Sequence, residues 1–377
     1  MKIYLKESVW DEAIKRMRWL FNEFDNVIVG VSGGKDSTVI FHLALKVAKE
    51  LKRLPVKVLF LDQEAEWAAT IRTVRQMMIR PDVTPMWLQV PFRLFNATSS
   101  RKEWLDAWDE SKRDLWIHPK EDIAIKENVY GVDRFIEFFP AVMEREFSNQ
   151  KACYIAGVRC EESPFRYMGM LEHTYKGVCW GKTLRKPRQH FTFYPIYDWS
   201  WVDVWKAIHD NGWPYCSLYD DYFRFGVSVQ QMRVSSLHHE TAIRSLYILQ
   251  ELEPETYERL VQRLPGIDSA GHLGVDDYFP KTLPFMFKDW REYRDYLLEN
   301  LIEVEADREK FRRVFRTQEK WWLESQGDKL LKRHISCILV GDYGQKLRGI
   351  GLNPHMAMIR QIKQGRMMST YALQEAK

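Results

Sequence analysis

Asn26-Val27-Ile28-Val29-Gly30-Val31-Ser32-Gly33-Gly34-Lys35-Asp36-Ser37 joins an apolar run to a glycine pair and a short polar segment. Residues 26–31 predict a buried strand, because they are rich in Val and Ile and end next to glycine and serine. Residues 37–51 predict a helix, because apolar residues recur there at helical spacing behind an Asp-Ser start signal. The glycine pair therefore lies in a turn between a strand and a helix.

This glycine turn has the chemistry of a phosphate site. Glycine lets the backbone approach a polyphosphate closely, and the helix start favours negative charge. Hydroxyl groups and a lysine add donors, and Asp36 can cap the helix or help to hold magnesium. A plain glycine turn with a helix cap is the alternative, but all six positions of the segment are filled, which favours phosphate. The predicted phosphate-binding residues are Ser32, Gly33, Gly34, Lys35, Asp36 and Ser37.

Strand and helix patterns alternate on both sides of this turn. Such alternation predicts an α/β fold, a parallel sheet with helices on both faces. Ligands of these sheets bind beyond the carboxyl ends of the strands, where Ser32 and Asp62 both fall. The predicted strands are 56–61, 86–90, 152–157 and 191–196, the last at an edge, and the predicted helices are 9–24, 67–78 and 201–209.

The length of 377 residues exceeds one ordinary core and predicts a main domain with a second region. Residues 1–240 form the predicted main domain, with a helical or irregular insertion rather than sheet near 95–150. Residues 241–377 are predicted to be mainly helical and end in a strand-like run, Ile335 to Val340. From Arg308 onward Lys and Arg outnumber Asp and Glu 15 to 6, so this region is basic and can attract an anionic partner.

Composition narrows the class of protein. No run approaches the roughly 18 apolar residues of a membrane span, and the charged N-terminus does not resemble a signal peptide. We therefore expect a cytoplasmic protein without a membrane partner. The five cysteines form no CxxC pair, which argues against a disulfide framework, a zinc knuckle or an iron–sulfur cluster.

Ser-Gly-Gly-Lys-Asp-Ser resembles the PP-loop signature of the adenine nucleotide α-hydrolase superfamily, and it lacks the spacing of a Walker A loop. Further motifs are similar to those of the phosphoadenosine phosphosulfate (PAPS) reductase family, and the resemblance covers roughly residues 20 to 235. These motifs are Phe60-Leu61-Asp62, Gly157-Val158-Arg159-Cys160-Glu161-Glu162-Ser163 with Arg166, and Tyr194-Pro195-Ile196-Tyr197-Asp198-Trp199-Ser200 followed by Asp203-Val204-Trp205.

The resemblance implies an adenine nucleotide site that includes Asp62, Gly157, Arg159 and Arg166. Arginines after a strand end can make forked bonds to phosphate, or they can pair with Glu161 or Glu162. Asp62 can bind the ribose or magnesium, or it can simply cap a loop. We expect Lys35, Asp36 and Arg159 to act in catalysis, with Asp36 as the magnesium ligand.

The chain also departs from the reductases that it resembles. Their catalytic Glu-Cys-Gly-x-His motif and paired cysteines are missing, and the phosphate loop is intact, as in relatives that use ATP. We therefore expect an enzyme that binds ATP and Mg²⁺ and cleaves ATP between the α and β phosphates. The alternatives are sulfur-group transfer from PAPS or adenylylsulfate, and a nucleotide-sensing regulator without catalysis.

Two basic regions leave the partner open. Residues 181–190 can bind a second anion, an acceptor or a nucleic acid, or can be a solvated loop, and the candidates are Lys182, Arg185, Lys186 and Arg188. The region after Arg308 can bind nucleic acid or a protein. The whole chain resembles the IbrA-type subfamily of PAPS reductase-like proteins, regarded as sulfotransferases or regulators, which implies a ParB-like partner protein.

Overall fold

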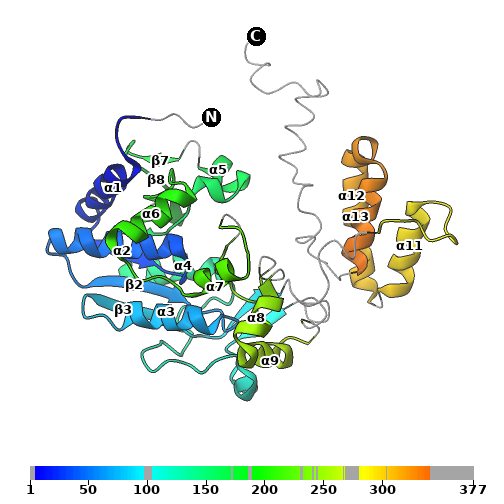
Figure 1. The fold of residues 1–377 in the computed structure, drawn as a ribbon, viewed down its shortest axis with the longest axis horizontal. Helices are drawn as coiled ribbons and strands as arrows, with labels where there is room; N and C mark the ends of the chain where they lie inside the picture. The colour runs from blue at the N-terminus through cyan, green and yellow to red at the C-terminus, as the bar shows by residue number, and fades with distance from the viewer. Residues whose placement is uncertain are drawn as a thin grey trace, which may run out of the picture. The chain divides into compact units, whose positions relative to one another are not determined.

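The computed structural model describes residues 5–96, 104–170, 173–185, 189–229, 232–239, 242, 245–265, 267, 280–302 and 304–339. The chain divides into two compact units (Figure 1). The first comprises Met1–Leu94, Trp104–Leu237 and Ile248–Arg263, and the second comprises Phe95–Glu103, His238–Tyr247 and Leu264–Lys377.

A seven-stranded sheet forms the centre of the first unit. The five strands from β3 to β9 are parallel to their neighbours, whereas β8 and β7 are antiparallel. The predicted mostly parallel sheet is therefore confirmed. Its order is β3 (Val83–Leu88), β2 (Val56–Leu61), β1 (Asn26–Gly30), β6 (Ala152–Ile155), β9 (His190–Phe193), β8 (Cys179–Arg185) and β7 (Thr174–Tyr175).

Helices cover both faces of this sheet. Alternate residues of β6 point to opposite faces. Cys153 and Ile155 join the apolar core that contains α2, whereas Tyr154 contacts Phe139 of α4 with ring centroids 5.3 Å apart. The helices α1 (Val9–Glu23) and α6 (Trp201–Asn211) pack beside α2 (Lys35–Glu50), and α4 (Phe135–Phe147) packs on β6, β8 and β9.

The strand predicted at 191–196 is not at an edge. It is β9, and it lies between β6 and β8. Pro195 lies two residues beyond Phe193, the last residue of β9, so the missing N–H of this proline does not interrupt the ladder. The hairpin of β7 and β8 then supplies the antiparallel neighbour.

The segment near 95–150 contains a strand, against the prediction of helical or irregular structure alone. Strand β5 (Trp104–Ala107) pairs with β4 (Phe92–Phe95) in a two-stranded sheet. Leu105 and Ala107 are buried while Trp104 is exposed, which is the alternation of a half-buried strand. The remaining elements of the first unit are α3 (Ala68–Met78), η1 (Glu110–Leu115), η2 (Cys160–Glu162), α5 (Pro164–Gly169), α7 (Leu218–Arg224), α8 (Leu246–Leu252, its first two residues in the second unit) and α9 (Pro254–Arg263).

The second unit contains the helices α11 (Trp290–Leu301), α12 (Glu305–Gln326) and α13 (Asp328–Leu339), which confirms a mainly helical C-terminal region. The strand predicted from Ile335 is wrong, because Ile335 to Leu339 end α13, and Val340 lies outside the described residues. Leu331, Ile335 and Ile338 repeat at helical spacing and are buried. Within the described ranges, no helix is both long and apolar enough to cross a membrane.

We expect Gly30→Ala to destabilise the first unit. A Cβ at Gly30 would lie 1.9 Å from the hydroxyl oxygen of Tyr154, whose ring packs against Phe139 of α4. Forcing atoms into a packed site costs about 1–3 kcal/mol or more. The measurement is chemical unfolding, with Gly169→Ala as the control because a Cβ there meets nothing within 4 Å. Equal unfolding free energies for the two variants would contradict the packing at Gly30.

Candidate phosphate-binding site

The glycine segment forms the predicted turn between β1 and α2. Gly34 is the N-cap of α2, and Gly33 has a φ of 73°, a left-handed conformation that favours glycine. The hydroxyl of Ser37 accepts a hydrogen bond from the N–H of Ser32 at 3.1 Å and donates to the carbonyl of Gly34 at 2.9 Å. The turn is therefore held in one shape by its own serine before any ligand arrives.

Two close contacts press other segments against this turn. A Cβ at Gly157 would lie 2.7 Å from the backbone carbonyl of Asp36, and a Cβ at Gly33 would lie 2.8 Å from the methyl group of Thr70. Tyr219 accepts a hydrogen bond from the N–H of Lys35 at 2.9 Å. The loop after β6, the start of α3 and α7 thus enclose the turn.

Buried charges gather at the start of α2. Lys35 and Arg159 are 6% and 4% exposed. Asp36 lies 3.3 Å from the ammonium of Lys35 and pairs with the guanidinium of Arg159. Burial lowers the pKa of Lys35, and Asp36 opposes that shift. The structure therefore brings together the three residues predicted for catalysis.

The arginines adopt the ion pairs that the sequence left as an alternative to phosphate. Arg159 lies 3.3 Å from Glu161 in addition to its pair with Asp36, and Arg166 pairs with Glu162. Arg233 was missed by sequence reasoning, and its guanidinium donates to the backbone carbonyl of Glu162 at 3.0 Å. It belongs to no motif, so only the folded chain reveals its place.

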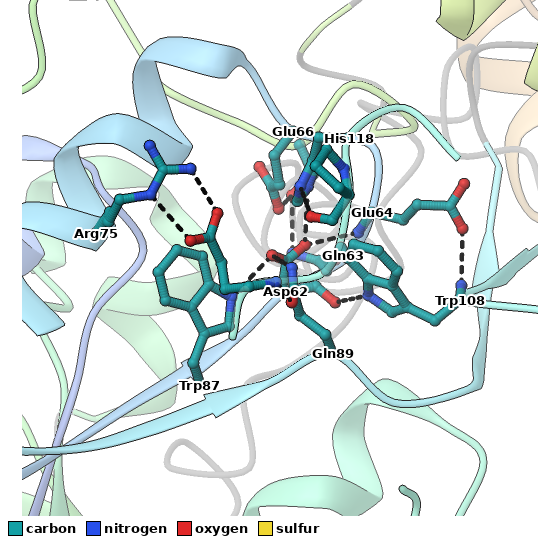
Figure 2. A network of polar contacts seen from close by, with 12 residues as sticks. Asp62, Gln63, Glu64, Glu66, Arg75, Trp87, Gln89, Trp108 and His118 are labelled. Atoms are coloured by element: carbon teal, nitrogen blue, oxygen red, sulfur yellow. Dashed lines mark hydrogen bonds and ion pairs between the residues drawn. The ribbon is translucent and has the colours of Figure 1, made fainter. Parts of the chain in front are cut away.

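Asp62 lies in a buried polar network next to β3 (Figure 2). One carboxylate oxygen accepts hydrogen bonds from Trp87 and Gln89, both at 2.9 Å. The other accepts the N–H of Glu64 at 2.9 Å and lies 3.4 Å from Nε2 of His118. Asp62 is fully buried, and by accepting the N–H of Glu64 it caps its own loop. No cluster of three metal-ligating side chains is present among the described residues.

Glu64 makes a second set of buried contacts. Its carboxylate binds the guanidinium of Arg263 at 2.6 and 3.0 Å, and both side chains are fully buried. It also accepts the N–H of Trp108 at 2.7 Å. Glu253 caps α3 by accepting the N–H groups of Ala68 and Ala69 at 2.7 and 2.9 Å. These hydrogen bonds hold the segment from 248 to 263 against the loop that follows β2 and against the start of α3.

The second predicted anion site is only partly described. Lys182 pairs with Thr192 in the ladder of β8 and β9, and its side chain is exposed. The backbone of Arg185 pairs with His190, but the side chain of Arg185, and Lys186 and Arg188, lie outside the described residues.

A mostly parallel sheet with a Ser-Gly-Gly-Lys-Asp-Ser turn at the carboxyl end of β1 is typical of a PP-loop nucleotide-binding fold. Residues 26–226 match the family model described as phosphoadenosine phosphosulfate reductase domain. Because this match spans more than half of the chain, the chain belongs to that family. Residues 226–368 match a second model, a domain of unknown function, DUF3440.

Several individual proteins are similar to the chain. The chain is 27% identical to the uncharacterized protein YbdN of Escherichia coli K12, over 81% of this chain and 78% of that protein. It is 23% identical to an adenosine 5′-phosphosulfate reductase of Lysinibacillus sphaericus, over 57% and 77%. A PAPS reductase structure from Candida auris matches with a TM-score of 0.36 and 16% identity, over 63% of this chain and 99% of that one.

We expect Arg263→Met to cost about 3–5 kcal/mol of unfolding free energy, because it leaves the Glu64 carboxylate buried without its counter-charge. The double variant with Glu64→Met should lose less than the sum of the single losses, which a double-mutant cycle measures. Lys206→Met is the control, since the side chain of Lys206 is 71% exposed and its ammonium pairs with Asp210. A loss for Arg263→Met no larger than that of the control contradicts the pairing.

We expect Glu66 to make stability fall as pH rises. Burial, with the charge of Asp62, raises the pKa of Glu66 from 4.5 to about 8. Between these values the folded protein binds more protons than the unfolded chain, so the unfolding free energy falls by up to about 1.4 kcal/mol per pH unit. Burial lowers the pKa of His118, but the Asp62 carboxylate shifts it upward overall, which adds in the same direction.

The measurement is urea unfolding from about pH 5 to 8. Glu66→Gln should flatten the slope, because the amide oxygen can still accept the hydrogen bond that Ser236 donates at 2.7 Å and the amide does not titrate. Exposed Glu251, changed to Gln, is the control and should keep the slope of the parent. A parent-like slope in Glu66→Gln excludes this carboxyl as its source.

Proposed function

We propose that the protein binds ATP with Mg²⁺ at the PP-loop and cleaves it between the α and β phosphates, transferring AMP to an acceptor. The observation that carries this proposal is the buried pair of cations, Lys35 and Arg159, at the N-terminal end of α2. A polyphosphate placed there meets two positive charges, the helix dipole and a preformed glycine turn. Pyrophosphate is the leaving group that such a site stabilises.

In this reaction a nucleophilic oxygen of the acceptor forms a bond to the α phosphorus, and the bond from that phosphorus to the bridging oxygen of the β phosphate breaks. The electron pair leaves with pyrophosphate. Lys35 and Arg159 offset the negative charge that develops on the leaving group. The proton of the nucleophile passes to solvent or to a base on the acceptor. Catalysis then rests on positioning and charge, as in phosphoryl transfer generally.

Magnesium fits the donor set only in part. Asp36 is the magnesium ligand expected from the sequence, but it already pairs with Lys35 and Arg159. Mg²⁺ keeps several waters and binds chiefly through phosphate oxygens and one or two carboxylates. We therefore expect the ion to arrive with ATP and Asp36 to contribute one contact, with Asp62 acting as the loop cap rather than as a ligand.

A second candidate is sulfur-group transfer from PAPS or adenylylsulfate, which the names of the reductase relatives favour. The chain lacks the Glu-Cys-Gly-x-His motif, and Cys153, Cys179 and Cys216 are buried. Burial raises the pKa of the thiol of Cys179 to about 12, which disfavours a thiolate nucleophile. These observations support ATP chemistry over resident thiol chemistry.

The helical region remains a candidate for partner binding. Helices α11, α12 and α13 share an apolar core that includes Leu298, Phe311 and Ile338. A packed core supports docking of a protein, such as a ParB-like partner, over a freely solvated nucleic-acid tail. A variant that lacks this region should end before Leu264, where the second unit resumes, because a truncation at Arg308, the start of the basic excess, would cut α12.

The test is calorimetric binding of ATP, AMP, adenylylsulfate and PAPS with and without Mg²⁺, combined with a pyrophosphate release assay. We expect ATP with Mg²⁺ to bind most tightly, and Lys35→Met to weaken ATP about ten-fold or more by removing a charge-assisted contact. Lys35 is the better probe because Asp36 neutralises two buried cations.

Lys206→Met serves as the matched surface control in these titrations. PAPS binding as tight as ATP binding would favour sulfur-group transfer. Unchanged ATP affinity in Lys35→Met would refute the assigned phosphate site.

A further inference from the structure

An apolar turn precedes α11 in the second unit. The N–H of Phe287 donates to the carbonyl of Pro284 at 3.1 Å, which places Phe285 and Met286 at the two central positions of the turn. Their side chains are 97% and 63% exposed. Central turn positions are usually filled by Gly, Pro, Asn, Asp or Ser. The geometry of the turn therefore does not account for two large apolar side chains at its tip.

The turn is anchored on both sides of this tip. Leu283 packs against buried apolar residues of α11 and α13. Phe287 stacks on Tyr293, with ring centroids 4.8 Å apart, and its ring centroid lies 5.2 Å from that of Tyr296. The side chain of Asp289 caps α11. Because the base of the turn is already ordered, little conformational entropy is lost when a partner binds the tip.

The tip and α11 form one apolar surface. Tyr296 is 53% exposed, and Phe287 and Tyr293 connect it to the turn. Aromatic and Met side chains are enriched at the centre of protein interfaces. Exposed apolar side chains that gather in one place mark a binding site. We call Phe285, Met286, Phe287, Tyr293 and Tyr296 the tip surface.

The charges around the tip surface indicate which partner it fits. Residues 280–302 carry four basic and four acidic side chains, so this stretch has no net charge. Arg291 and Arg294 both pair with Glu319. Nucleic acids and anionic membranes are bound through an excess of positive charge, which this stretch does not have. A neutral surface does not repel its own copy, and its charges of both signs can pair across a contact between copies.

The shape of the tip surface also suits a second copy. In a twofold dimer both copies use the same surface, so a protrusion on each copy must meet a receiving surface on the other. Phe285 and Met286 form the protrusion, and the rings of Tyr293 and Tyr296 lie on α11 next to the turn. One surface therefore supplies both parts.

We infer that two copies of this chain associate through the tip surface about a twofold axis, with Phe285 of each copy packed against Tyr296 of the other. The inference goes beyond the proposed function and does not depend on it, because all of these residues lie in the second unit.

The test is the mass of the full chain in solution, measured by sedimentation velocity as the protein concentration rises. We expect wild type to approach twice the mass of one 45.1 kDa chain. Phe285→Asp should weaken association about ten-fold or more, because it places a charge at the centre of an apolar contact, whereas Phe285→Leu should weaken it less. Phe223→Asp is the matched control and should associate like wild type, since Phe223 is 69% exposed and lies in α7 of the first unit.

A mixture of two variants tests the arrangement within the dimer. Tyr296→Lys alone should also associate weakly. In an equal mixture of Tyr296→Lys with Phe285→Asp, the introduced ammonium meets the introduced carboxylate, while the other half of the contact keeps Phe285 and Tyr296. We expect this mixture to recover most of the wild-type association.

A single-chain mass for wild type at every concentration up to about 100 µM overturns the inference, and so does a dimer that survives Phe285→Asp unchanged. Wild type that stays a single chain but floats with vesicles of phosphatidylcholine and phosphatidylglycerol, and needs Phe285 to do so, would assign the tip surface to a membrane instead. A mixture that associates no better than either variant alone overturns the pairing of Phe285 with Tyr296.

Discussion

Close packing of other segments against two glycines is the constraint on which the candidate site depends. A side chain at Gly157 would collide with the carbonyl of Asp36, and one at Gly33 would collide with Thr70. These contacts set the distances between the PP-loop, the segment after β6 and the start of α3. Arg159 lies two residues beyond Gly157, so its reach to Asp36 follows from where the backbones touch. The cations are thus preorganised by main-chain packing, and little side-chain ordering is left for a ligand to impose.

The second constraint is the burial of acidic side chains in the loop that follows β2. Three acidic side chains, those of Asp62, Glu64 and Glu66, are buried there, and each needs a specific compensation. Asp62 receives neutral donors and His118, Glu64 receives Arg263, and Glu66 hydrogen-bonds to Ser236. The loop can hold a single conformation only while all of these partners are in place.

The sequence was sufficient where a pattern is local. The strand before Ser32, the helix after it and the strand end at Asp62 all appear as predicted, because apolar period and turn residues decide them within a few positions. Partners distant in sequence could not be predicted. Nothing local to Arg263, Glu253 or Arg233 signals that they would meet residues some 70 to 200 positions away. The prediction of a strand at Ile335 failed for another reason. A short apolar run is compatible with either a strand or a helix, and only the longer helical spacing that begins at Leu330 shows that this run belongs to a helix.

The place of α9 bears on how this chain can have been inherited. The reductase family match ends at 226, whereas Arg263 and Glu253 lie in the stretch matched by the second family model. A gene fragment ending at that junction would encode a β2 loop with a buried, uncompensated carboxylate and an uncapped α3. Recombination at 226 would thus separate Glu64 and the start of α3 from the side chains that compensate them, Arg263 and Glu253. The two matched regions are therefore expected to pass between genomes as one piece.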